Sequence, residues 1–155
     1  VLETDDGTYI SESLAICHYL EDLHPEPNLL GNSPMEKAQV IMWNSIAEQG
    51  MDAAAEVLRN ISPGFRGHAL PGPVPIEQIP ALVERGQVRL NQFFDRIEQQ
   101  LQNNAYLAGA NYSFADITLV ATTEFSDWVE THAYDTRPAL KRWYTEATAR
   151  TASKA

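Results

Sequence analysis

The chain lacks the means to form an internal disulfide, and it lacks a stretch that could cross a membrane. Cys17 is the only cysteine among the 155 residues. Because disulfides persist mainly in oxidising compartments, a lone cysteine favours a reducing, cytoplasmic setting. No apolar run approaches the roughly 20 residues that a membrane-spanning helix needs, and no secretory signal opens the sequence. We therefore expect no membrane partner.

Positive charge is also scarce. The sequence holds 11 Lys and Arg residues against 21 Asp and Glu, which gives a net charge of −10. A surface that binds nucleic acid needs clustered Lys and Arg, whereas these residues are scattered, so we exclude nucleic acid as a partner. A small anionic ligand would have to be held by local backbone donors. The four histidines show no metal-ligand spacing, and we expect no metal site.

The composition that remains, 44% hydrophobic and 21% charged residues, is typical of a globular protein. Residues 1–10 indicate two short strands around a tight turn, because Asp5-Asp6-Gly7 accepts positive φ. A helix is expected over residues 11–23, since the residue before Pro25 avoids the helical region. Two strands alone are marginal in water, so we expect a preceding part of the protein to supply their neighbours.

Prolines and glycines divide the rest of the chain. Residues 24–34 contain three prolines and predict a boundary between domains. Residues 62–80 contain five prolines and three glycines and predict a long loop. This loop, with Phe65 and Arg66, would either connect helices or border a pocket, and we favour a connection.

The segments between these breaks are predicted to be helices. Ser33-Pro34 favours the start of a helix that reaches about residue 60, and others are expected over about 81–102, from 113 and from 138. The inward face expected for the first comprises Ala38, Ile41, Met42, Ser45 and Ile46. For the second it comprises Leu90, Phe93, Phe94, Ile97 and Leu101. For the third it comprises Ile117, Val120, Ala121, Phe125 and Trp128, and for the fourth Leu140, Trp143, Tyr144 and Ala147.

The triplet Ser11-Glu12-Ser13 stands at the predicted start of the helix over 11–23. A helix N-terminus presents unpaired N–H groups and the positive end of the helix dipole, and both favour a carboxylate. The Ser13 hydroxyl adds a donor, and Glu12 is placed to pair with an ammonium group beside that carboxylate. Together these groups suit an α-amino-acid head group. On spacing alone, the simpler interpretation is that Ser11 and Ser13 cap the helix.

Three further residue types have structural interpretations. Ser113 and Asp116 stand at the N-cap and third positions of a helix, as in a capping box with Asp in place of Glu. Cys17 is interpreted as a small buried hydrophobe rather than a nucleophile. Trp43, Trp128 and Trp143 fall at helical spacing and are expected to pack in the core.

Taken together in order, these segments resemble the cytosolic glutathione S-transferase family, bacterial members in particular. The resemblance rests on Asp6-Gly7 to Tyr19-Leu20, the proline-rich linker, Ser113-Phe114-Ala115-Asp116 and the tail from Arg137-Pro138 to Thr151-Ala152. It implies a mostly α fold, in which an all-helical C-terminal domain follows the terminal β-hairpin and helix of a thioredoxin-like α/β domain. The implied domains are residues 1–24, a linker at 25–34, and 35–155.

The resemblance also implies a function. The family's Glu-Ser pair, here Glu12 and Ser13, binds the γ-glutamyl end of glutathione, the co-substrate that is transferred to a hydrophobic electrophilic small molecule. The family's catalytic Ser, Tyr or Cys belongs to a β-α-β unit that precedes this hairpin, so we nominate no catalytic residue in this chain. The alternative is a non-catalytic interaction module of the same fold.

Two weaker implications concern the helix that ends near residue 60. Met51, Ala55, Leu58 and Arg59 are implicated by position in the electrophile pocket. The same helix often contributes to a homodimer interface in the family, where Glu48 or Asp52 would offer a carboxylate to the partner's glutathione. We therefore expect a homodimer.

Overall fold

The computed structural model describes residues 1–150. Two short strands, β1 (Leu2–Glu3) and β2 (Tyr9–Ile10), are followed by helix α1 (Ser13–Leu23). Four further helices, each at least as long as α1, follow: α2 (Pro34–Ile61), α3 (Ala81–Asn103), α4 (Phe114–Asp127) and α5 (Pro138–Thr148). Short 3-10 turns lie at Pro63–Phe65 and Ala133–Asp135. No helix within residues 1–150 is long and apolar enough to cross a membrane.

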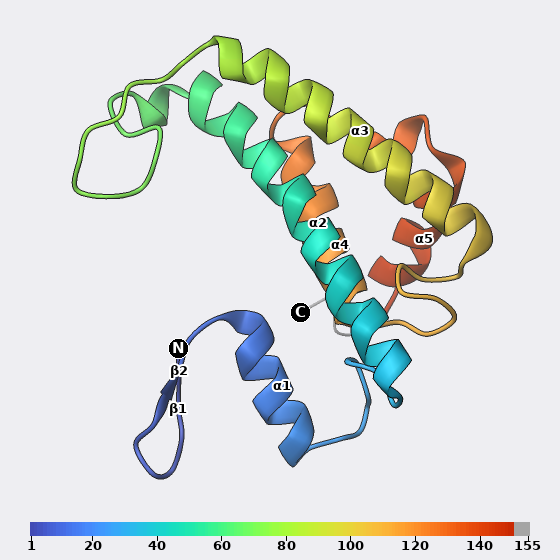
Figure 1. Ribbon diagram of the computed structural model, residues 1–155. Coiled ribbons are helices and arrows are strands. Elements are labelled where there is room, and N and C mark those ends of the chain that lie inside the picture. Colours follow the sequence, from blue (N-terminus) through green and yellow to red (C-terminus); the bar gives the residue numbers. More distant parts are fainter. Residues whose placement is uncertain (151–155) are drawn as a thin grey trace.

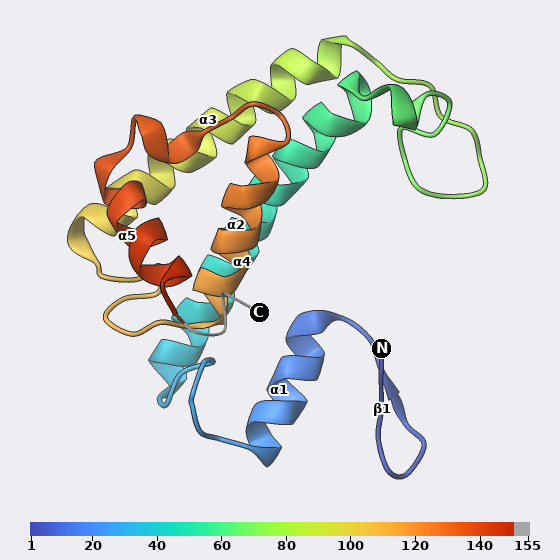
Figure 2. The ribbon, with the colours of Figure 1, turned by 180° about the vertical axis from the view of Figure 1, so that it is seen from behind.

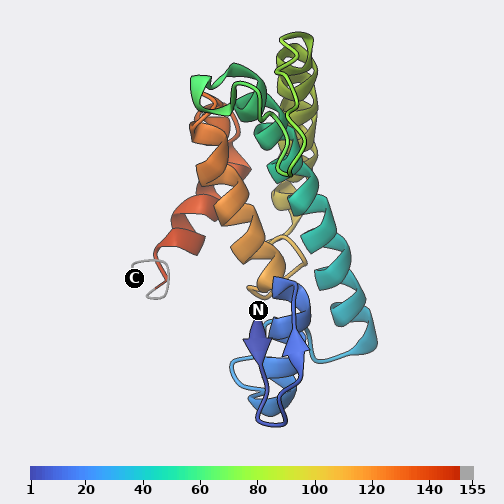
Figure 3. The same cartoon turned by 90° about the vertical axis from the view of Figure 1, so that its left-hand side faces the viewer.

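The strands form the antiparallel hairpin that the sequence predicts, with Leu2 opposite Ile10. The Asp6 carboxylate closes the turn, since its Oδ1 accepts hydrogen bonds from the Thr4 hydroxyl and from the Thr8 N–H at 3.1 Å. The hairpin and α1 lie at one end of the helical bundle rather than within it (Figures 1 and 3). Helix α1 buries no side chain completely.

The remaining helices form the mostly α bundle that the sequence predicts. Helix α2 packs against both α3 and α4, and α5 closes the bundle against the same two helices (Figures 1 and 2). All five residues of the inward face predicted for α3 are buried. The largest fully buried apolar side chains are Leu90, Phe94, Ile97, Leu101, Leu107, Leu119, Leu140 and Trp143.

Two glycines allow α2 and α3 to approach closely. A Cβ atom on Gly50 would lie within 2.6 Å of three ring atoms of Phe93. A Cβ on Gly86 would lie 2.7 Å from Cγ2 of Val57 and 3.2 Å from the carbonyl oxygen of Ala53. Real Cβ contacts are longer than these, so a side chain at either position would push the helices apart or displace the neighbour.

Side chains of α3 and α5 form hydrogen bonds with the unpaired backbone groups at each other's ends. The Glu98 carboxylate accepts hydrogen bonds from the N–H groups of Ala139 and Leu140, at 3.1 and 2.8 Å, in the first turn of α5. Arg142 Nη2 donates at 2.7 Å to the carbonyl of Leu101 in the last turn of α3. These terminal backbone groups have no partner within their own helices, so both contacts replace hydrogen bonds that the groups would otherwise form with water.

The start of α4 is held by a buried carboxylate. The capping box predicted for Ser113 and Asp116 is present. Asp116 Oδ2 accepts from the Ser113 N–H and hydroxyl at 2.9 and 3.0 Å, while Oδ1 accepts from the Leu107 N–H and from Trp143 Nε1, both at 2.8 Å. Burial raises the pKa of Asp116 above its ordinary value despite these four donors. One side chain therefore joins α4 to α5 and to the loop after α3.

The linker between α1 and α2 is fixed by a second carboxylate. Glu21, in the last part of α1, accepts from Asn28 Nδ2 and from the N–H of Leu29, both at 2.8 Å, and from the N–H of Leu30 at 3.1 Å. The Leu29 carbonyl in turn accepts from the N–H of Phe114, the first residue of α4, at 2.9 Å. A continuous set of hydrogen bonds thus runs from α1 to α4.

The inward face predicted for α4 is wrong for Ile117, Ala121 and Trp128, which are exposed, whereas Val120 and Phe125 are partly buried against the core. Trp128 is 71% exposed and Ile117 is 40% exposed, whereas Thr122, Thr123 and Ser126 are completely buried. The buried hydroxyls donate to backbone carbonyls, as Thr122 does to Ala47 at 3.2 Å, so they enter the core without losing hydrogen bonds. Ala115 and Leu119 share this buried face, whereas Ile117 and Trp128 point away from it.

The inward face predicted for α2 is wrong in its first half. Of the five residues expected there, only Ile46 is buried, and Met42 is 47% exposed. The core face instead carries Val40, Trp43 and Asn44. Asn44 lies inside because its Oδ1 accepts from the Thr118 hydroxyl at 2.6 Å and its Nδ2 donates to Glu48 at 3.0 Å.

We expect Gly50→Ala to lower the free energy of unfolding by about 1–2 kcal/mol, because the displacement of Phe93 outweighs the better helix propensity of alanine. Chemical denaturation measures the change. Gln49→Ala, on the exposed side of the same turn, is the control and should change stability little. Equal stability of the two variants would contradict the close α2–α3 contact.

We expect Ser113→Ala to lower the free energy of unfolding by about 1–2 kcal/mol, because it removes one donor from a buried carboxylate. The melting temperature and the denaturation midpoint should both fall. Ser45→Ala, an exposed position within α2, is the control. A melting temperature that matches the unsubstituted chain would refute this role for the Ser113 hydroxyl.

Candidate functional site

The N-terminus of α1 lies in the polar triplet that the sequence singles out, but not where it was expected. The helix begins at Ser13 with Glu12 as its N-cap residue, two residues after the predicted start at Ser11. The capping interpretation of Ser11 and Ser13 is wrong, since no side chain forms a capping hydrogen bond. The first helical hydrogen bond runs from the Ile16 N–H to the Glu12 carbonyl at 3.0 Å.

This arrangement leaves a small cluster of donors at the surface. The N–H groups of the first helical turn have no partner within the helix, and they carry the positive end of its dipole. Glu12 and Ser13 are both exposed, so a carboxylate, an amide and a hydroxyl can reach one external group. The two predicted site residues are adjacent in space as well as in sequence.

Glu12 has an unusual backbone conformation. Its φ is 69° and its ψ is 122°, in the half of conformational space that side chains other than glycine seldom adopt. Such a conformation costs about 1–3 kcal/mol and persists only where the surrounding structure enforces it. Here β2 ends at Ile10 and α1 begins at Ser13, so Glu12 makes the sharp change of direction between them. Strain of this kind is typical of ligand-binding positions.

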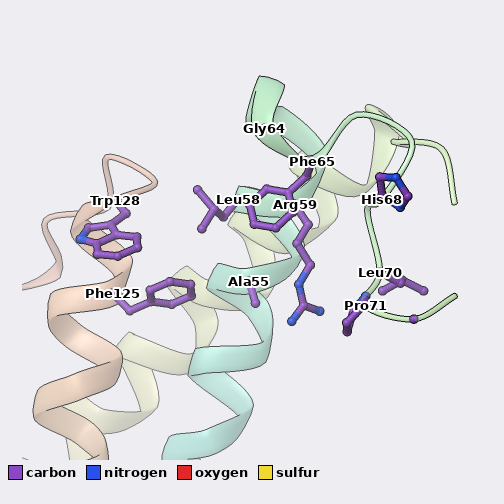
Figure 4. Close-up of a pocket in the computed structure, with 11 residues that line it drawn as sticks. Ala55, Leu58, Arg59, Gly64, Phe65, His68, Leu70, Pro71, Phe125 and Trp128 are labelled. Carbon is purple, nitrogen blue, oxygen red and sulfur yellow. The ribbon is translucent and has the colours of Figure 1, made fainter. Parts of the chain in front are cut away.

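A second feature is an apolar cavity of about 500 Å³ at the C-terminal end of α2 (Figure 4). Ala55, Leu58 and Arg59 of α2 form one side, and Phe125 and Trp128 of α4 form another. The long loop supplies the rest: Gly64, Phe65, His68, Leu70, Pro71 and Gly72. The loop and the N-terminal end of α1 lie on the same side of the molecule (Figure 1).

The cavity matches the predicted electrophile pocket in part. Ala55, Leu58 and Arg59 line it as expected, while Met51 is not among the lining residues. The preference for a purely connecting loop is wrong, because Phe65 also lines the cavity; its neighbour Arg66 does not.

The loop is held over the end of α2 by hydrogen bonds. Gln78 Nε2 donates to the carbonyls of Arg59 and Ser62, at 2.8 and 2.7 Å, and Asn60 Oδ1 accepts from the Ile79 N–H at 2.8 Å. The segment therefore has a defined path although it is rich in proline and glycine. Its polar anchors lie more than 15 residues from their partners in sequence, which explains why local pattern alone suggested a simple connection.

Phe125 and Trp128 are the site residues that sequence reasoning missed. Both were expected in the core; Phe125 is partly buried against it, Trp128 is exposed, and both line the cavity, with ring centroids 5.4 Å apart. The available signal was the Thr- and Ser-rich opposite side of α4, whose hydroxyls could bond backbone carbonyls. Helical spacing of apolar residues does not distinguish a core face from a cavity wall.

The remaining reactive or acidic candidates lie elsewhere in the structure. Cys17 is half-buried, and burial together with the nearby Glu21 raises the pKa of its thiol, so it is a poor nucleophile. Within residues 1–150 no group of three His, Cys, Asp or Glu side chains could hold a metal ion. Glu48 and Asp52 are exposed on α2, and the Glu48 carboxylate accepts from Asn44.

Comparison with known proteins matches both parts of this structure to one family. The profile described as glutathione S-transferase, C-terminal domain, matches residues 51–151, and that described as glutathione S-transferase, N-terminal domain, matches residues 1–28. Glutathione S-transferase 2 of Saccharomyces cerevisiae is 35% identical over 150 residues, which cover 93% of this chain and 60% of that protein. The chain thus spans less than two thirds of the length of this relative.

Two further similarities bear on fold and function. The crystal structure of Gtt2 from Saccharomyces cerevisiae superimposes with a TM-score of 0.85 at 30% identity, over 99% of this chain and 72% of that one. Elongation factor 1-gamma 1 of the same yeast is 30% identical over 148 residues, covering 89% of this chain and 33% of that protein. Because the C-terminal domain profile covers more than half of the chain, and the hairpin, α1 and the bundle all have counterparts in Gtt2, the chain belongs to the glutathione S-transferase family.

Proposed function

We propose that this protein transfers glutathione to hydrophobic, electrophilic small molecules. The observation that carries the proposal is the N-terminus of α1, where Glu12 keeps a strained backbone and Ser13 stands exposed beside uncapped N–H groups. A residue whose only task was to join β2 to α1 would be better served by glycine at a φ of 69°.

The chemistry of this N-terminus suits the γ-glutamyl end of glutathione. That end carries a carboxylate next to an ammonium group. The carboxylate would accept hydrogen bonds from the first N–H groups of α1 and from the Ser13 hydroxyl, at the positive end of the helix dipole. The Glu12 carboxylate would pair with the ammonium group, which an isolated helix end cannot do. Both charges of the head group are thereby matched.

The apolar cavity supplies a place for the second substrate. Its walls are mainly aromatic and aliphatic, and its volume of about 500 Å³ lies in the range of small-molecule sites. The reaction requires the glutathione sulfur as a thiolate, since the thiol is the weaker nucleophile. We assign no residue within 1–150 to that activation. Binding both substrates on one frame raises their effective concentration and orients them.

The alternative is a non-catalytic interaction module, and the similarity to elongation factor 1-gamma 1 is the observation in its favour. A module of that kind has no need for a strained Glu12 beside an exposed Ser13, so we favour the transferase. A cytoplasmic location and a homodimer are part of the proposal. The dimer is supported by apolar side chains that α2 leaves exposed, namely Met35, Ile41 and Met42.

The proposed glutathione contacts predict that substitution at the site weakens glutathione binding without lowering the stability of the fold. Glu12→Gly and Ser13→Ala should each weaken retention on immobilised glutathione by about tenfold, the value of one charge-assisted interaction. Glu12→Gly should not lower the melting temperature, because relief of the positive φ offsets the entropy of glycine in the unfolded chain. Ser11→Ala is the control, and undiminished retention of both site variants would count against the head-group assignment.

The transfer reaction itself is tested on the complete gene product. We expect it to conjugate glutathione to a chlorinated nitrobenzene. The absorbance of the thioether product measures the reaction. We expect negligible turnover from the 155-residue chain alone, because we assign no residue within 1–150 to thiolate stabilisation. Absence of both turnover and glutathione retention in the complete gene product would rule out the transferase and leave the interaction module.

A further inference from the structure

The charge of the cavity at the end of α2 is opposite to that of the protein. The chain carries 21 acidic residues against 11 basic ones. The residues that line the cavity nevertheless include Arg59 and His68 and not one Asp or Glu. A pocket for an uncharged electrophile would need no such selection, so the composition of the lining indicates a ligand that carries negative charge.

Arg59 differs from the arginines that stabilise the fold. Arg85, Arg89, Arg137 and Arg142 form ion pairs with carboxylates, and Arg96 and Arg150 lie over aromatic rings. Among the hydrogen bonds and ion pairs of residues 1–150, none involves the Arg59 guanidinium. Its side chain is half-buried and extends from α2 along the cavity towards the loop that carries Pro71 (Figure 4). It is thus a cation held in a cavity without a counter-ion.

The rest of the cavity selects for a flat, apolar body. Phe125 projects from α4 towards α2, Trp128 lies at the C-terminal end of α4, and Phe65 lines the cavity from the loop (Figure 4). Aromatic rings of this kind stack on aromatic ligands, and an arginine beside them binds a carboxylate with several donors.

We propose that the second substrate is an aromatic electrophile that bears a carboxylate, with its ring against Phe125 and Trp128 and its carboxylate on Arg59. This inference rests on the proposed transferase function and names the substrate class of the same cavity. With an aryl chloride, the glutathione thiolate forms a carbon–sulfur bond at the ring carbon, and chloride leaves with the bonding electron pair. The thiol proton passes to solvent, and nothing is oxidised or reduced.

A matched pair of probes tests the assignment in the complete gene product. The first is para-chloro-meta-nitrobenzoate, and the second is its uncharged carboxamide, which has the same ring and leaving group. Arg59→Gln should lower kcat/KM for the benzoate by about tenfold relative to the carboxamide, whereas Arg59→Lys should keep much of the preference. The ratio between variants cancels the different intrinsic reactivity of the two probes. Arg66→Gln is the charge-matched control, since Arg66 belongs to the same loop but does not line the cavity.

Binding without turnover gives an independent measurement. Nitroaromatic ligands quench tryptophan fluorescence, and Trp128 is the exposed tryptophan of the cavity. Quenching titrations of the 155-residue chain should show that Arg59→Gln loses affinity for the benzoate but not for the carboxamide. Equal loss for both probes, or no loss for either, would overturn the assignment.

The two proposals fail in distinguishable ways. If both probes are conjugated but Arg59→Gln changes them equally, the transferase stands and the anionic substrate class is wrong. If neither probe is conjugated, the transferase proposal is wrong for these electrophiles, and the quenching titrations alone decide whether the cavity selects an aromatic carboxylate.

Discussion

The buried carboxylate of Asp116 is the interaction on which the rest of the structure depends. Removing an ionised carboxylate from water costs several kcal/mol unless donors replace the lost water, and here four donors converge on it from α4 itself, from Leu107 and from Trp143. Because Asp116 must point into the bundle, the rotation of α4 about its axis is fixed. Phe125 follows nine residues later, about two and a half helical turns, and therefore faces the opposite way. The carboxylate that binds these four donors thus also sets the direction in which Phe125 points towards the cavity.

Local rules predicted the elements of this fold well. The hairpin turn, the Ser33 and Ser113 helix starts and the whole inward face of α3 follow from chemistry between residues close in sequence. The faces of α2 and α4 did not follow in full, because some of their polar groups find partners far along the chain: the Thr122 hydroxyl bonds the Ala47 carbonyl, 75 residues away, and the Thr118 hydroxyl bonds Asn44, 74 residues away. A helical pattern records which side chains are apolar, but it does not record which hydroxyls will find a carbonyl in the core.

The candidate site divides in the same way. Glu12 and Ser13 were identifiable because a polar triplet at a helix start has a local physical meaning, although the positive φ of Glu12 and the later start of α1 required coordinates. The cavity was identifiable only on its α2 side. Its loop has the composition of a connection, and the hydrogen bonds of Gln78 that fold it over α2 have no local signature. Its aromatic wall belonged to the helix face that the pattern assigned to the core.

Polar contacts help to hold α1, at one end of the molecule, on the helical bundle. Helix α1 buries no side chain completely, so its position relative to the bundle cannot come from side-chain packing alone. Instead Glu21 binds the N–H groups of Leu29 and Leu30, and the Leu29 carbonyl binds the first N–H of α4. Leu30 of that linker is itself buried, with 3% of its surface exposed. Since each hydrogen bond contributes only about 1 kcal/mol, the attachment of α1 depends on several of these contacts acting together.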